Sequence, residues 1–136
     1  MNVVVDANIF ISGIYRGGNP RNVLKTLIDG IGTLFITDEI VDEIENALKK
    51  PKFGLTVKEV KDRITEIEGL GKKVIISPKH RVTGICRDLD DDKYLGCALA
   101  ANADYIISGD RDLLDLKEYC GVKIVNARDY LDIVGA

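Results

Sequence analysis

Short apolar runs alternate with segments of helical periodicity along most of this chain, and that alternation restricts the folds it can adopt. Runs typical of buried strands occupy residues 2–5, 33–36, 73–76, 105–108 and 122–125. Apolar residues at helical spacing predict helices over about 20–30, 38–49, 57–68 and 92–101, with a short last helix after Asn126. Asn19 and Thr37 are expected to cap the first two of these helices. Strands that alternate with helices predict an α/β fold with a parallel sheet of about five strands.

The composition is that of a soluble globular chain, and it argues against several other classes. With 136 residues, 46% of them apolar and 30% charged, we expect a single domain over residues 1–136. No apolar run approaches the roughly 20 residues of a membrane span, and the N-terminus begins with a strand pattern instead of a signal peptide. The three cysteines are far apart and form no CxxC pair. A disulfide framework or zinc site is therefore not expected. A cytoplasmic location is expected instead.

Four acidic residues stand where a strand gives way to a helix or at the edge of an apolar helical face: Asp6, Glu43, Asp92 and Asp110. Asp6 and Asp110 follow apolar strands, and ligands of open α/β sheets bind beyond the carboxyl ends of the strands. Glu43 falls at the edge of its helix's apolar stripe, where an unpaired carboxylate is costly. Each acid also has a plain structural interpretation. The aspartates can cap turns or helices, and Glu43 can form a salt bridge with a lysine.

As a set, the four acids predict a site for Mg²⁺ or Mn²⁺. Carboxylates held together repel one another and raise each other's pKa, and a divalent cation removes that penalty. Carboxylates with water ligands suit these two hard cations, and there is no histidine partner. Asp112 is a candidate further ligand, and Asn8 and Ser108 are candidates to hold a ligand by hydrogen bonds. The consecutive acids of 90–92 leave open which one is the third ligand.

Three stretches of the chain resemble the PIN-domain family of metal-dependent ribonucleases: VVVDANIFISG, ITDEIVDEIENALKKPKF and DLDDDKYLGCALAANADYIISGDRDLL. The resemblance covers nearly the full length. It implies a PIN-like fold, a three-layer α/β/α arrangement around a Rossmann-like parallel sheet. It also implies catalytic acids at Asp6, Glu43, Asp92 and Asp110, where the distance to Ser108-Gly109-Asp110 favours Asp92 as the third. Many similar proteins are VapC-like toxins, so the resemblance further implies single-stranded RNA as substrate, a cognate antitoxin as partner, and a homodimer or higher homo-oligomer.

The expected reaction is hydrolysis of a phosphodiester by one or two metal ions held by the four acids, with Asp110 as a candidate to orient the attacking water. The net charge of −3 does not indicate binding to nucleic acid through bulk charge. Individual cations can still line an RNA path or simply be solvated: Arg16, Arg21, Lys49, Lys50 and Lys52. The sequence leaves two alternatives open. One is a non-catalytic PIN-like module that binds RNA or protein. The other is a phosphatase of the haloacid dehalogenase type, which requires a second aspartate where this chain has Asn8.

Overall fold

A computed structural model describes all 136 residues and contains one six-stranded sheet in the order β3-β2-β1-β4-β6-β5. All neighbouring strands are parallel except β5 and β6. The strands are β1 (Asn2–Val5), β2 (Thr33–Ile36), β3 (Lys72–Lys73), β4 (Tyr105–Ile107), β5 (Glu118–Tyr119) and β6 (Val122–Val125). The predicted α/β fold with a mainly parallel sheet is therefore confirmed.

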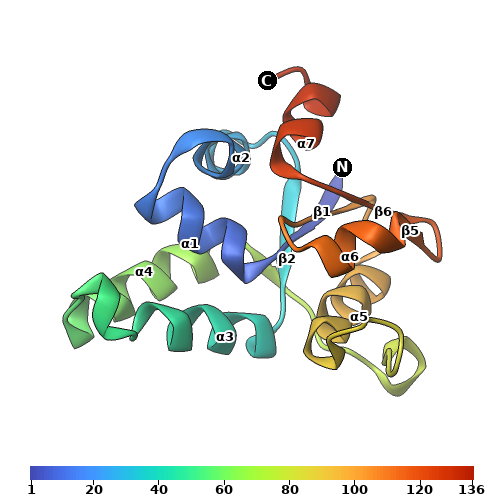
Figure 1. Cartoon of the computed structure of the whole chain (residues 1–136), viewed down its shortest axis with the longest axis horizontal. Coiled ribbons are helices and arrows are strands. Elements are labelled where there is room, and N and C mark those ends of the chain that lie inside the picture. The colour runs from blue at the N-terminus through green and yellow to red at the C-terminus, as the bar shows by residue number, and fades with distance from the viewer.

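Helices flank the sheet on both faces, with α1 and α2 on one side of the strands and α5 on the other (Figure 1). The helices are α1 (Ala7–Tyr15), α2 (Gly18–Ile28), α3 (Asp38–Leu48), α4 (Val57–Leu70), α5 (Asp92–Ala101), α6 (Arg111–Leu116) and α7 (Ala127–Val134). Three short 3-10 turns are η1 (Pro51–Phe53), η2 (Pro78–His80) and η3 (Leu89–Asp91). Helix α2 contacts α1 and α7, and α3 contacts α1 and α4. No helix combines the length and apolar character needed to cross a membrane.

Several local predictions were wrong or incomplete. Helix α1 was not predicted, because its apolar run Ile9-Phe10-Ile11 has no clear helical spacing; it begins where Asp6 accepts a hydrogen bond from the backbone N–H of Asn8. Helix α2 has no side-chain cap and begins at Gly18, so Asn19 lies inside it. The third strand covers only Lys72–Lys73 instead of 73–76, since it lies at the sheet edge. Helix α6 and the antiparallel edge strand β5 were also missed.

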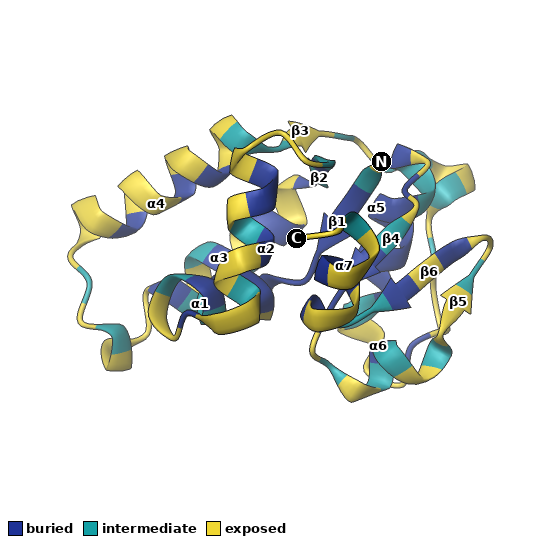
Figure 2. Cartoon of the chain, turned by 90° about the horizontal axis from the view of Figure 1, so that it is seen from above, coloured by how far each residue is buried: buried dark blue, intermediate teal, exposed yellow.

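The core lies on both faces of the central strands. Residues 3–5 of β1 and residues 106–107 of β4 are buried, whereas α4 exposes its outer face (Figure 2). Helix α5 packs on β1, β2 and β4 and is buried along most of its length, as its all-round apolar sequence predicts. Gly13 allows α1 and α2 to approach, because a Cβ atom there would lie 2.7 Å from Leu24 Cδ1.

The parallel register brings the ends of β1 and β4 together. Val5 pairs with Ile107, and the N–H of Asp6 donates to the Ile107 carbonyl at 2.9 Å. Asp6 and Ser108 follow these two strands directly, so their side chains emerge next to each other at the carboxyl edge of the sheet. This is where ligands bind in open α/β sheets.

Candidate metal centre

Ser108 joins the ends of the two central strands through its hydroxyl group. The hydroxyl donates to Asp6 Oδ2 at 2.7 Å and accepts from the N–H of Asp110 at 2.9 Å. Asp110 then caps α6, where its Oδ1 atom accepts from the N–H of Asp112 at 3.0 Å. One buried serine therefore fixes the positions of two predicted site acids. That Ser108 supports a metal ligand in this way stays a prediction.

Asp6 is almost fully buried, and its surroundings act on its charge in opposite directions. Burial raises its pKa most, while the hydrogen bonds from Ser108 and from the N–H of Asn8 work to lower it. The net result is a pKa above the ordinary value, with a small contribution from the negative charge of Glu43. A carboxylate under these conditions is stabilised by a nearby cation.

Asp91, the last residue of η3, is the third acid that the structure brings to this edge. Burial first, and then the neighbouring carboxylate of Asp110, raise the pKa of Asp91 to about 8, and Asp6 and Asp88 contribute in the same direction. The Oδ2 atom of Asp91 is buried and has no hydrogen-bond partner. Such an oxygen is costly unless something else binds it. Asp6, Asp91 and Asp110 thus form a cluster of mutually destabilising carboxylates.

An open cavity of about 550 Å³ contains this cluster. Most of its polar lining is acidic: Asp6, Glu39, Asp42, Glu43, Asp88, Asp90, Asp91 and Asp110. The positive side chains in the lining are Lys50 and Lys93. We call this cavity the acidic pocket. Its charge suits a bound cation far better than a free anion.

Asp92 does not lie in the acidic pocket. Its two carboxylate oxygens accept hydrogen bonds from the backbone N–H groups of Gly84, at 2.8 Å, and Cys86, at 2.7 Å. Burial works to raise the pKa of Asp92, but these hydrogen bonds outweigh it and lower the pKa. Asp92 thus lies apart from the other predicted ligands. Its carboxylate holds the loop that contains Gly84 and Cys86, before α5, through these hydrogen bonds. Of the three consecutive acids, Asp91 is the one that meets Asp6 and Asp110.

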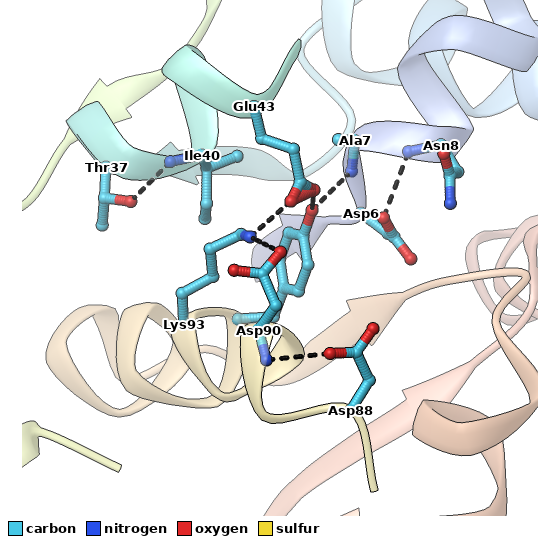
Figure 3. A network of polar contacts seen from close by, with 10 residues as sticks. Asp6, Ala7, Asn8, Thr37, Ile40, Glu43, Asp88, Asp90 and Lys93 are labelled. Carbon is cyan, nitrogen blue, oxygen red and sulfur yellow. Dashed lines mark hydrogen bonds and ion pairs between the residues drawn. The ribbon is translucent and has the colours of Figure 1, made fainter. Parts of the chain in front are cut away.

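Glu43 reaches the acidic pocket from α3, and two side chains of α5 hold it (Figure 3). The ammonium group of Lys93 pairs with Glu43 Oε2, and the hydroxyl of Tyr94 donates to Glu43 Oε1. The salt bridge to a lysine, considered above as the structural alternative, is therefore present. The same Tyr94 hydroxyl accepts from the N–H of Ala7 at 3.1 Å, so this buried ring links α1, α3 and α5.

Lys93 is buried and also pairs with Asp90 at 2.9 Å. Burial works to lower the pKa of Lys93, but Glu43 and Asp90 together raise it above its ordinary value, so the group stays charged. Sequence reasoning missed Lys93 and Tyr94. A signal existed, because a lysine and a tyrosine in the first turn of a helix that is apolar on all sides need polar partners.

Of the remaining two predicted residues, only Asn8 lines the acidic pocket. Asp112 forms an ion pair with Arg87 at 3.2 Å and does not line the acidic pocket. Asn8 lines the pocket with an exposed side chain, while only its backbone N–H contacts Asp6. Neither residue is positioned as a direct ligand.

The donor set fits a hard divalent cation that keeps part of its water. No group of three histidine, cysteine, aspartate or glutamate side chains converges into a ready-made metal cage. Mg²⁺ is usually held through one or two carboxylates together with several waters, and does not require such a cage. The orphaned oxygen of Asp91, beside Asp110 and Asp6, provides donors of this kind. With no histidine in the lining and no cysteine, zinc is a poor match.

Comparison with known families identifies the family of this chain. Residues 2–112 match the family model of the PIN domain. The chain belongs to the PIN-domain family. The resemblance seen in the three sequence stretches is thus confirmed. A comparison with curated proteins found no significant match.

Solved structures similar to this chain support the same fold. VapBC2 from Rickettsia felis, bound to a DNA fragment from its promoter, matches with a TM-score of 0.64 at 15% identity, over 93% of this chain and 98% of that chain. PAE2754 from Pyrobaculum aerophilum matches with a TM-score of 0.64 at 16% identity, over 99% of this chain and 90% of that chain. At these identities the similarity concerns the fold, which is PIN-like as predicted.

Proposed function

We propose that this PIN-domain chain is an endoribonuclease that hydrolyses single-stranded RNA with the help of Mg²⁺ or Mn²⁺. The observation that carries the proposal is the clustering of Asp6, Asp91 and Asp110 at the carboxyl edge of the sheet, in a pocket with an acidic lining. PIN domains are generally nucleases, and such a cluster is costly without a cation. We also propose that residues 1–136 form a single nuclease domain.

The proposed ligands are Asp6, Asp91 and Asp110. Ser108 would hold Asp6 and the start of α6 in fixed positions relative to each other, because its hydroxyl forms hydrogen bonds with both. A bound divalent cation supplies Lewis-acid stabilisation of the negative charge that develops on the phosphate. Glu43 remains a candidate ligand, although a cation that binds it would compete with the contacts from Lys93 and Tyr94. Lys50, which lines the pocket and has no ion-pair partner, would attract the RNA phosphate.

A protein partner and a biological role follow as further parts of the proposal. The family resemblance implied a toxin with a cognate antitoxin and a homo-oligomeric state, in the cytoplasm. The likeness to VapBC2 of Rickettsia felis supports the antitoxin part of this proposal. No observation favours the alternatives of a non-catalytic binding module or a haloacid-dehalogenase-type phosphatase, and the match to the PIN domain argues against the phosphatase.

Cleavage of single-stranded RNA in the presence of Mn²⁺ is the expected activity. The assay compares the wild-type chain in Mn²⁺ with the wild type in EDTA and with Asp6→Asn in Mn²⁺. Asparagine can still accept the hydrogen bond that starts α1, so this variant is expected to fold while it loses a ligand charge. Only the first sample should degrade the RNA. Equal degradation in all three samples, or none in the first, would contradict the proposed function.

A further inference from the structure

A second pocket adjoins the acidic pocket along α1. It has a volume of about 380 Å³ and lies between one side of α1 and the turn η1. Asn8 lines both pockets, so the two share a wall. The lining of the second pocket contains no acidic residue and includes Tyr15, Arg16, Lys52 and Phe53. We call it the aromatic pocket.

Two stacked rings form one side of the aromatic pocket. The ring centroids of Tyr15 and Phe53 are 4.5 Å apart, with an interplanar angle of 26°. Tyr15 remains 37% exposed, so part of its ring surface is free although Phe53 supports it from η1. Fixed aromatic surfaces of this kind are what unpaired bases stack on in proteins that bind single-stranded nucleic acid.

Two cations complete the pocket. Lys52 Nζ lies 5.1 Å from the centroid of the Phe53 ring. Neither Lys52 nor Arg16 forms an ion pair with a carboxylate, so both charges are available to a ligand. An aromatic surface with adjacent free cations can bind the base and the phosphate of the same nucleotide. The simpler role of the ring pair, holding η1 against α1, would not require a pocket with two unpaired cations.

We propose that the aromatic pocket binds one unpaired nucleotide of an RNA strand, next to the phosphodiester held at the acidic pocket. The base lies against Tyr15, and Lys52 and Arg16 contact the backbone phosphate. This assignment rests on the proposed function, since it places the pocket beside the cleaved bond. It also predicts a preference for single strands, because a base inside a duplex is not available for stacking.

The test measures binding of a fluorescent single-stranded oligoribonucleotide by anisotropy, in the Asp6→Asn background with Mn²⁺, so that cleavage does not interfere. Tyr15→Ala is expected to weaken binding by about tenfold, and Tyr15→Phe to restore it, because stacking requires the ring and not the hydroxyl. Lys52→Gln is expected to weaken binding a few-fold and to reduce its salt dependence. The matched control is Lys123→Gln, which should change little because Lys123 is an exposed residue of β6 outside both pockets.

The outcomes separate this assignment from the proposed function. Equal affinity in all four variants, or loss in Tyr15→Ala that Tyr15→Phe does not restore, overturns the nucleotide site while wild-type cleavage stands. No binding by the Asp6→Asn chain also overturns it. Melting curves of each variant show whether the chain is folded, and a duplex of the same sequence should respond little to Tyr15→Ala. Failure of the wild type to cleave RNA in Mn²⁺ rejects the proposed function independently of the binding data.

Discussion

Asp91→Asn is expected to lower kcat for RNA cleavage by about 100-fold or more at saturating Mn²⁺, whereas Asp92→Asn is expected to stay within about tenfold of the wild type. The two substitutions are the same chemical change at consecutive positions. They differ in where the carboxylate points. Asp91 faces Asp6 and Asp110, while both oxygens of Asp92 accept hydrogen bonds from the loop backbone.

The measurement is the initial rate of cleavage of a single-stranded oligoribonucleotide at a temperature well below both melting transitions. Asp92→Asn serves as the control, since it removes a neighbouring negative charge without touching the acidic pocket. A larger loss in Asp92→Asn than in Asp91→Asn would show that the sequence-based choice of Asp92 was right and that the structural assignment of Asp91 is wrong.

The same pair of variants is expected to change stability in opposite directions in the absence of metal. Asp91→Asn removes a crowded charge and should raise the free energy of unfolding by about 1 kcal/mol at pH 8, a modest figure because solvent screens this partly exposed group. Asp92→Asn weakens two hydrogen bonds to a charged acceptor and should lower it by about 2 kcal/mol. These changes correspond to shifts of several degrees in Tm for a chain of this size.

The difference in stability between Asp91→Asn and the wild type is expected to depend on pH. The pKa of Asp91 is raised to about 8 in the folded chain from an ordinary value of 3.8. Between these values the folded chain keeps a proton that the unfolded chain has released. The contribution of Asp91 to the free energy of unfolding is therefore fully present below about pH 4, and it is lost as the pH rises through about 8. Thermal melting in EDTA should therefore show the advantage of Asp91→Asn over the wild type growing from pH 4 to pH 8. A constant or shrinking difference would contradict this.

The sequence predicts the parts of the site that depend on strand ends. Asp6 and Asp110 follow strands that are recognisable in the sequence as apolar runs. The parallel pairing of β1 and β4 brings the carboxyl ends of these strands together. The choice between Asp91 and Asp92 could not be made this way. It depends on the 3-10 turn η3 and on backbone N–H groups of Gly84 and Cys86, in a loop without periodicity.

Glu43 illustrates a second limit of the sequence pattern. Its position at the edge of an apolar stripe indicated that its carboxylate needs a partner, and the carboxylate has one in the structure. The partner is Lys93, which lies on a different helix and comes beside Glu43 only through the packing of α3 and α5. A helical wheel describes one helix, so it cannot distinguish a metal ion from a lysine of another helix.

The most direct test of the proposed metal centre is a Mn²⁺ titration followed by thermal melting, with the wild type and Asp91→Asn side by side. A ligand that binds only the folded chain stabilises it by about 2.7 kcal/mol at a hundred times its Kd. The wild-type Tm should rise with Mn²⁺ concentration over several degrees, and the Tm of Asp91→Asn should begin higher and stay nearly constant. Equal rises in the two proteins, or no rise in the wild type, would contradict a metal centre at Asp6, Asp91 and Asp110.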